Sequence, residues 1–243
     1  MFQTAINQYL KSHNYSSINL KAVLFDMDGV LFNSMPYHAE AWNKIMADRG
    51  ITLSKEEAYM HEGRTGADTI NLIYKREWGR DATDEEIKAI YEDKCKVFNS
   101  NPPAQPIEGV QSVINKVKRD GLLTMIVTGS GQLSLLDRLN HHFPDTFKRE
   151  LMVTAFDIKF GKPNPDPYLM GLKKGGLKAN EAIVIENAPL GVQAGASAGI
   201  FTIAVNTGPL PDKILWDAGA DLLFPSMQAL NESWDELFKA LKG

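Results

Sequence analysis

Apolar residues follow two different patterns along this chain. Between residues 37 and 100 they recur at helical spacing, as in Trp42, Ile45 and Met46, without a run typical of a strand. After residue 106, short continuous apolar runs alternate with segments of helical spacing. Strands that alternate with helices are typical of a parallel sheet covered on both faces. We therefore predict an α/β fold, a doubly wound parallel sheet that carries an all-helical insertion.

The predicted strands are the short apolar runs. We expect strands at residues 21–27, 122–127, 151–154, 182–185, 201–205 and 222–224. We expect the accompanying helices at residues 109–118, 132–141, 166–174, 191–198 and 228–241. The first strand is a near-continuous apolar run, which indicates a central position in the sheet.

The helical insertion follows the first strand. Its four helices are predicted near residues 37–49, after Ser54, at 67–78 and from Thr83 to Phe98. Ser54 and Thr83 are each followed three residues later by a glutamate, the spacing of a capping box. The proline cluster at 101–106 cannot continue a helix. We therefore divide the chain into a leader helix (1–20), a core domain (21–35 and 106–243) and a cap domain (36–105).

Composition and charge narrow the class of protein. Of the 243 residues, 44% are hydrophobic and 23% charged, as in ordinary globular proteins. The formal net charge of −4 predicts neither nucleic acid nor membrane as a partner. The single cysteine, Cys95, cannot form an internal disulfide, and residues 1–20 lack the apolar block of a signal peptide. We expect a cytoplasmic monomer.

Two carboxylates stand at the end of the first strand. Asp26 and Asp28 are two residues apart, so their side chains point to the same side. Two adjacent anions are costly unless a cation binds there or one carboxyl keeps a proton for acid–base chemistry. The alternative is an ordinary solvated turn in which Gly29 supplies a positive φ.

Polar groups also stand at the ends of the next three strands. Thr128-Gly129-Ser130 follows the second strand and has the composition of a phosphate-binding loop. Lys162 follows the third, between a glycine and a proline, and Glu186-Asn187 follows the fourth. Taken singly, Ser130 could be a helix N-cap and Lys162 a solvated lysine. Ligands of parallel sheets bind beyond the carboxyl ends of the strands, so we expect the four groups to form one site.

These four groups resemble the four motifs of the haloacid dehalogenase superfamily of phosphotransferases, over nearly the whole chain after residue 20. The helical insertion matches that family's cap domain, and the rest its Rossmann-like core. The stretch from Asp26 to Trp42 resembles the β-phosphoglucomutase subfamily. The segments 33–38 and 61–66 are similar to a subgroup that includes an inorganic pyrophosphatase.

The resemblance implies a role for each motif. Asp26 would be the nucleophile that forms an aspartyl phosphate, and Asp28 the general acid and base. Mg²⁺ would be the cofactor, bound by Asp26, the backbone carbonyl of Asp28 and an oxygen from the Glu186/Asn187 pair. The remaining motif residues would hold and neutralise the transferring phosphoryl group: Thr128, Gly129, Ser130 and Lys162.

The fourth motif departs from the family pattern, which usually has an acidic pair where this chain has Glu186-Asn187. Glu62 of the cap is our candidate for the missing anion. Arg64 could clamp a distal phosphate, and His38 could bind substrate or relay protons. The alternatives are a solvated loop glutamate, a surface arginine and a structural histidine.

The sequence therefore predicts a Mg²⁺-dependent phosphohydrolase. Its substrate would be a small phosphorylated metabolite, with inorganic pyrophosphate favoured. A β-phosphoglucomutase is the alternative within the family. The alternative from another class is a non-enzymatic phospho-aspartate switch. A positioned acid–base such as Asp28 favours an enzyme over a switch, because a switch needs a long-lived phospho-aspartate.

Overall fold

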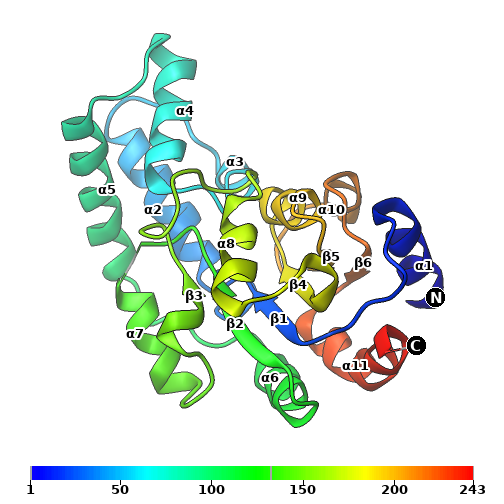
Figure 1. Cartoon of the computed structure of the whole chain (residues 1–243). Helices are drawn as coiled ribbons and strands as arrows, with labels where there is room; N and C mark the ends of the chain where they lie inside the picture. The colour runs from blue at the N-terminus through cyan, green and yellow to red at the C-terminus, as the bar shows by residue number, and fades with distance from the viewer. Residues whose placement is uncertain (1, 132, 243) are drawn as a thin grey trace.

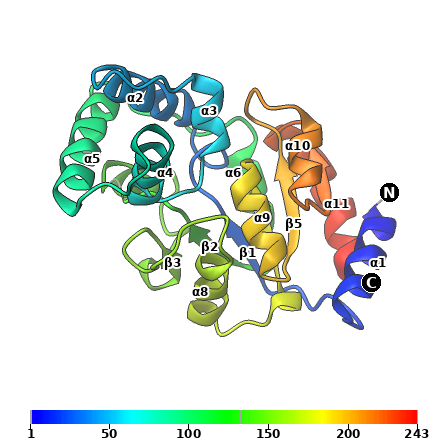
Figure 2. The same ribbon diagram turned by 90° about the horizontal axis from the view of Figure 1, so that it is seen from above.

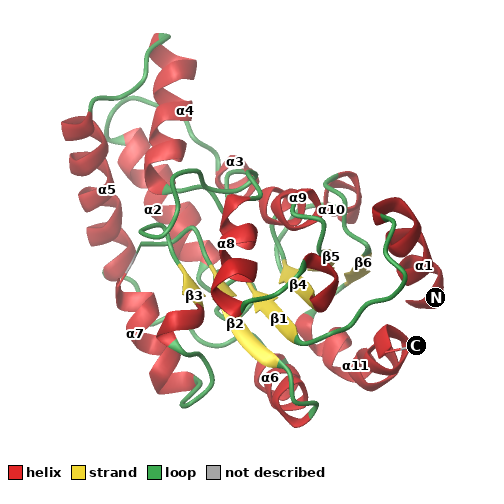
Figure 3. Cartoon of the chain, viewed as in Figure 1, coloured by secondary structure: helices red, strands yellow, loops and turns green. Residues whose placement is uncertain are grey.

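The centre of the molecule is a six-stranded parallel sheet (Figures 1 and 3). The computed structural model describes residues 2–131 and 133–242, apart from the side chains of 133–137. The sheet has the order β3-β2-β1-β4-β5-β6, and every paired strand is parallel. Its strands are β1 Ala22–Phe25, β2 Leu123–Val127, β3 Met152–Val153, β4 Ala182–Glu186, β5 Phe201–Val205 and β6 Leu222–Phe224. The predicted α/β class is confirmed.

Helices cover both faces of the sheet. Because alternate side chains of a strand point to opposite faces, Phe25 belongs to one hydrophobic cluster and Leu24 to the other. The first cluster is formed with α1 Phe2–His13, α6 Val110–Arg119, α7 Leu133–His142 and α11 Met227–Lys242. The opposite face is covered by α8 Asp166–Gly175, α9 Pro189–Ser197 and α10 Asp212–Asp217. Burial on both faces explains why the strands are continuous apolar runs.

Most predicted strands and helices are present, with ends that differ by at most two residues, except that the leader helix ends at His13. The helix α10 was not predicted, nor were the 3-10 turns Arg149–Leu151 and Ala179–Glu181. Each is too short to show a helical period in the sequence. The predicted start of α7 at Gln132 lies outside the described residues.

Four helices inserted after β1 pack against one another beyond the sheet (Figures 1 and 2). They are α2 Met35–Ala47, α3 Lys55–Met60, α4 Gly66–Trp78 and α5 Asp84–Asn99. They share a hydrophobic cluster that includes Ile45, Ile70 and Ile90. Thr83 and Glu86 form the predicted capping box, while Ser54 caps α3 through its side chain alone. We call α2–α5 the cap; the boundaries 36–105, like those of the leader and core domains, stay a prediction.

The helix α1 packs against α11 and the β5 side of the sheet. Tyr9 is buried there, contacts the ring of Phe201 edge-on and donates a hydrogen bond to the carbonyl of Gly199 at 2.8 Å. None of the helices in the described part of the chain has the length and apolarity needed to cross a bilayer.

The strand order determines where a site can form. β1 lies between β2 and β4, and the chain moves outward from β1 to β3 before it crosses back to β4. Such a reversal of strand order opens a crevice at the carboxyl ends of the neighbouring strands. Asp26, Thr128 and Glu186 stand at the ends of these three adjacent strands.

Candidate active site

Asp26 and Lys162 form a buried ion pair at the end of β1. The Lys162 Nζ lies 2.6 Å from Asp26 Oδ1, 2.6 Å from Glu186 Oε1 and 3.0 Å from the carbonyl oxygen of Val127. An ammonium group has three N–H donors, so these three acceptors satisfy it completely. The structure thus brings together three residues that are far apart in sequence, as predicted.

The site carries more negative charge than Lys162 neutralises. Burial raises the pKa of Asp26 well above its ordinary value, and the neighbouring Glu186 and Asp28 raise it further, against the lowering effect of Lys162. Burial opposes the charge of Lys162, but Asp26 and Glu186 outweigh it and its pKa is raised. A further cation would therefore stabilise the carboxylates at this strand end.

Asp28 is held by a chain of hydrogen bonds that reaches into the cap. Ser34 Oγ donates to Asp28 Oδ1 at 2.6 Å, and His38 Nε2 lies 3.2 Å from the same oxygen. Lys94 Nζ lies 2.7 Å from His38 Nδ1. Because an ammonium can only donate, Nδ1 of His38 accepts the hydrogen bond from Lys94. Nε2 therefore carries the imidazole proton and donates a hydrogen bond to Asp28. His38 is therefore neutral in this arrangement.

The charges around Asp28 agree with this assignment. Burial, and then the charge of Lys94, lower the pKa of His38, which outweighs the raising effect of Asp28. Burial alone would raise the pKa of Asp28, but His38, Ser34 and Lys94 together outweigh it, and the net direction is down. Asp28 is a carboxylate in this arrangement and can take up a proton.

Sequence reasoning did not single out Lys94. It lies on the buried face of α5, where burial lowers its pKa to about 8. The rings of Trp42, Tyr91 and Phe98 lie 5.1–5.9 Å from its Nζ and stabilise the charge. Lys94 comes four residues after Ile90 and four before Phe98. A lysine within an apolar helical stripe is a signal that could have found it.

The loop after β2 lines the cavity beside the aspartates. Thr128 is buried, and its Oγ1 accepts a hydrogen bond from the N–H of Ser130 at 3.0 Å. A Cβ added at Gly129 would lie 2.5 Å from the carbonyl oxygen of Gly63, which belongs to the loop after α3. A glycine at 129 therefore allows the cap backbone to lie directly against this loop.

Glu186 and Asn187 have different surroundings. Glu186 Oε1 accepts from Lys162 and from the hydroxyl of Tyr168, while Oε2 accepts from the N–H groups of Asn187 and Ala188. Asn187 Nδ2 donates to Glu62 Oε1 at 3.0 Å. The other amide atom, Oδ1, is buried and has no hydrogen-bond partner. Both carboxylate oxygens of Glu186 thus already accept two hydrogen bonds each, whereas Oδ1 of Asn187 is available to bind a cation.

Glu62 brings a cap carboxylate to the strand ends. It follows α3, and only 8% of its surface is exposed. Burial, followed by the nearby charge of Asp26, raises its pKa well above the ordinary value. The structure therefore places Glu62 beside the fourth motif, where the sequence analysis put the missing anion.

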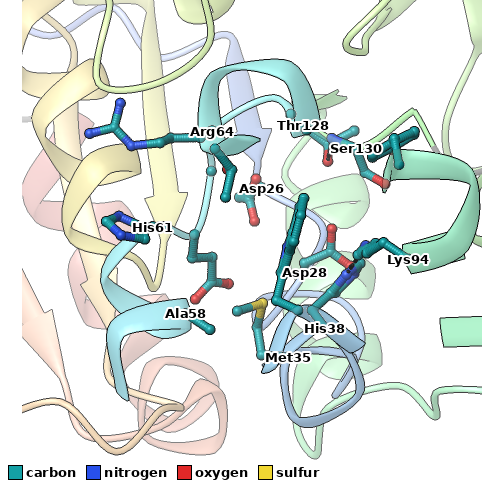
Figure 4. Close-up of a pocket in the computed structure, with 17 residues that line it drawn as sticks. Asp26, Asp28, Met35, His38, Ala58, His61, Arg64, Lys94, Thr128 and Ser130 are labelled. Atoms are coloured by element: carbon teal, nitrogen blue, oxygen red, sulfur yellow. Dashed lines mark hydrogen bonds and ion pairs between the residues drawn. The ribbon is translucent and has the colours of Figure 1, made fainter. Parts of the chain in front are cut away.

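A cavity of about 70 Å³ lies between the strand ends and the cap (Figure 4). Asp26, Asp28, Thr128 and Glu62 line it, together with apolar side chains of the cap: Met35, Trp42 and Ala58. Arg64 also lines it, but its guanidinium points away from Asp26 (Figure 4). We therefore do not assign Arg64 to a distal phosphate.

The sequence itself matches a known family. Residues 23–205 match the family described as haloacid dehalogenase-like hydrolase. The chain belongs to this family. The predicted resemblance to haloacid dehalogenases is confirmed, and a hydrolase of this family is an enzyme rather than a phospho-aspartate switch.

Three relatives illustrate the similarity. A phosphorylated carbohydrates phosphatase of Thermotoga maritima is 28% identical over 213 residues, 87% of this chain and 97% of that protein. Hexitol phosphatase A of Escherichia coli is 30% identical over 186 residues, 76% and 83% of the two chains. A Bacteroides vulgatus structure, named provisionally as a beta-phosphoglucomutase, is 64% identical with a TM-score of 0.97 and covers 100% and 98%. These names include no pyrophosphatase, and that part of the resemblance is not shown.

Enzymes of the haloacid dehalogenase family generally use Mg²⁺, and the residues here fit that ion. Within the described residues, no three His, Cys, Asp or Glu side chains are already gathered as a metal cluster. The donor set is instead mixed: Asp26, Glu62 and the unpartnered Oδ1 of Asn187. Such oxygen donors suit Mg²⁺. Because Glu186 is occupied by Lys162, the contacts favour Glu62 over Glu186 as the acid that would complete the site.

Proposed function

We propose that this protein is a Mg²⁺-dependent phosphohydrolase that forms an aspartyl phosphate on Asp26, with inorganic pyrophosphate as its substrate. The observation that carries the proposal is the position of Glu62. A cap carboxylate is buried against Asn187, beside the nucleophile, where the leaving group of a substrate would lie.

The space beside Asp26 supports a compact leaving group. A sugar phosphatase has to place a sugar ring between the core and the cap. Here the cavity has a volume of about 70 Å³, against about 300–1,000 Å³ for ordinary small-molecule sites. Phosphate is a small leaving group. A second acid at the metal site would strengthen the binding of the cation, and the cation in turn attracts the negative charge of pyrophosphate.

The nucleophilic step begins at Asp26. Its carboxylate oxygen attacks phosphorus, a new O–P bond forms, the bridging P–O bond breaks, and inorganic phosphate leaves with the bond electrons. Thr128, the N–H groups of Gly129 and Ser130, and Lys162 would hold the transferring oxygens. Bound Mg²⁺, held by Asp26, Asn187 and Glu62, would supply the positive charge that offsets repulsion between the two anions.

Water completes the cycle with the help of Asp28. Ser34 and His38 both donate to Oδ1 of Asp28, so we place the proton transfer on Oδ2. Oδ2 takes the proton of the attacking water, the O–P bond to Asp26 breaks, and phosphate is released. Asp28 begins as a carboxylate, so the proton that it takes from water is the one it can give to the leaving phosphate of the next turnover.

A β-phosphoglucomutase or sugar phosphatase is the second candidate function. Its support is the 64% identity to the Bacteroides vulgatus protein and the names of the two phosphatase relatives. A second cavity, of about 230 Å³, also lies beside Asn187 and Met35, between Tyr59 and residues 207–209. It could accommodate a larger leaving group.

A substrate comparison separates the candidates. Purified protein would be given pyrophosphate, β-glucose 1-phosphate and a hexitol phosphate, each with MgCl₂ and with EDTA. We expect phosphate release to be fastest from pyrophosphate and to require Mg²⁺. Conversion of glucose 1-phosphate to the 6-phosphate without net phosphate release would instead identify a mutase, and fastest release from hexitol phosphate a sugar phosphatase.

A further inference from the structure

Tyr168 lies directly beneath the ammonium group of Lys162. It is the third residue of α8, it is buried, and its hydroxyl donates to Glu186 Oε1 at 2.9 Å. The Lys162 Nζ lies 5.1 Å from the centre of its ring. Tyr168 has no role in the proposed chemical steps, although it lies only six residues after Lys162 in the chain.

The hydrogen bonds of Glu186 are complete because of Tyr168. A carboxylate has about four lone-pair positions. Here Lys162 and Tyr168 donate to Oε1, and the N–H groups of Asn187 and Ala188 donate to Oε2 at 2.9 and 3.1 Å. Three of these four donors belong to groups other than Lys162. Glu186 can therefore keep its position when the lysine moves.

Lys162 must release a partner before it can bind a phosphoryl oxygen. Its three donors are occupied by Asp26, Glu186 and the carbonyl of Val127. Asp26 is the proposed nucleophile, and its charge has to stay neutralised as an anion approaches. Of the two carboxylates, Glu186 keeps three hydrogen bonds after the exchange, so its release costs less than that of Asp26.

We propose that Tyr168 is a positioning residue that allows Lys162 to exchange Glu186 for an oxygen of the phosphoryl group. Its hydroxyl keeps the vacated Oε1 of Glu186 hydrogen-bonded, and its ring continues to face the ammonium. Burial raises the pKa of Tyr168 well above its ordinary value, so the hydroxyl remains a donor. The inference rests on the proposed function in one respect, that phosphoryl transfer takes place at Asp26 and Lys162.

The direct test is Tyr168→Phe, which removes the hydroxyl and keeps the ring. Affinity for inorganic phosphate would be measured by calorimetry in the presence of Mg²⁺. Without the hydroxyl, release of Glu186 leaves a buried charged oxygen short of a partner. We expect phosphate affinity to fall about five- to tenfold, the size of one hydrogen bond.

Tyr9→Phe is the matched control. It also removes one buried tyrosine hydroxyl, which donates to Gly199 O at 2.8 Å on the α1 side of the sheet. We expect a similar decrease in melting temperature in both variants and unchanged phosphate affinity in Tyr9→Phe alone. Equal phosphate affinity in Tyr168→Phe and wild type would overturn the inference.

A second variant tests the exchange itself. In Glu186→Gln, the contact that Lys162 has to break is with a neutral amide rather than with a carboxylate. Breaking it costs less, so the affinity for phosphate should increase. In that background the further change Tyr168→Phe should alter affinity less than about twofold, since no buried charge is left uncompensated. Weaker phosphate binding in Glu186→Gln, or an equal loss from Tyr168→Phe in both backgrounds, would contradict the exchange.

Phosphate is the product whichever phosphate compound the enzyme hydrolyses. Wild-type protein that binds phosphate but leaves pyrophosphate intact would refute the proposed substrate. It would not affect the comparison of Tyr168→Phe with wild type, which therefore tests the positioning role separately.

Discussion

The strand-end residues of the core and the residues of the cap are held to very different degrees. In the core, Asp26, Lys162 and Glu186 are buried and joined by contacts of 2.6 Å. In the cap, Glu62 reaches the core through one hydrogen bond of 3.0 Å to Asn187. We propose that the chemical step takes place at the strand ends, whereas the residues that select the leaving group belong to the cap. On this proposal, the core determines the reaction type and the cap determines the substrate.

Lys94 and His38 connect these two regions. They belong to cap helices α5 and α2, yet their hydrogen bonds end on Asp28 of the core. The position of Asp28, the proposed proton-transfer group, therefore depends partly on the cap. Four substitutions test how far the division between core and cap holds, from the largest expected effect to the smallest.

Removing the nucleophile should have the largest effect. In Asp26→Asn we expect turnover to fall by at least about a thousandfold, because the amide cannot form the acyl phosphate. Phosphate release with MgCl₂ measures it. Asp221→Asn is the control, since Asp221 is a partly buried carboxyl that accepts its hydrogen bond from the N–H of Thr202 in β5. Activity within tenfold of wild type in Asp26→Asn would rule out the covalent step.

Glu62→Gln should have the next largest effect. The neutral amide removes the cap anion beside Asn187, and we expect kcat/KM for pyrophosphate to fall about 10- to 100-fold, with a higher Mg²⁺ requirement. Glu57→Gln, in α3 of the same cap, is the control because its carboxylate contacts Arg76 and His61 instead. Equal Mg²⁺ dependence in the two variants would mean that Glu62 has no part in the metal site.

Lys94→Met separates activity from stability. Without the hydrogen bond from Lys94 to Nδ1, either ring nitrogen of His38 can carry the proton, and the hydrogen bond from Nε2 to Asp28 is no longer ensured. We therefore expect kcat to fall about tenfold. The same change removes a buried charge whose pKa is about 8, below the unfolded value of about 10.4. It should raise the free energy of unfolding by up to about 3 kcal/mol at neutral pH.

The pH dependence of that difference has a definite sign. Between pH 8 and 10.4 the unfolded wild type binds a proton that the folded protein has lost, so wild-type stability rises with pH through this window. The advantage of Lys94→Met should therefore shrink by about 1.4 kcal/mol per pH unit there. Urea unfolding at pH 7, 9 and 10 measures it, and a difference independent of pH would contradict the lowered pKa.

Gly129→Ala should have the smallest effect, since it acts only where core and cap meet. The new Cβ would lie 2.5 Å from Gly63 O and push the loop after α3 outward. We expect KM for pyrophosphate to rise a few-fold and the melting temperature to fall, because the atoms that must shift are backbone atoms of Gly63 and Arg64. Gly208→Ala is the control because its Cβ would make only an ordinary contact of 3.5 Å with Tyr59. A KM in Gly129→Ala equal to that of Gly208→Ala would mean that this contact is not needed.

The sequence predicted the core better than the cap chemistry for a physical reason. Period-two and period-3.6 patterns locate strands and helices, and parallel strands bring their carboxyl ends together, so Asp26, Thr128 and Lys162 could be grouped in advance. The partners of Lys94 and Tyr168 could not be predicted, because each acts through a tertiary contact with a residue far away in the chain. An oxygen from the Glu186/Asn187 pair was predicted to bind metal, and the contacts of Glu186 with Lys162 and the unpartnered Oδ1 of Asn187 favour Asn187 in that role.

The most direct test of the account is to follow pyrophosphate labelled with ³²P in a rapid-quench experiment with the Mg²⁺-loaded enzyme. We expect label on Asp26, identified by reduction of the acyl phosphate and mass spectrometry, to appear before the second phosphate is released. Asp26→Asn should carry no label. Phosphate release with no labelled enzyme, or label on another residue, would contradict the account.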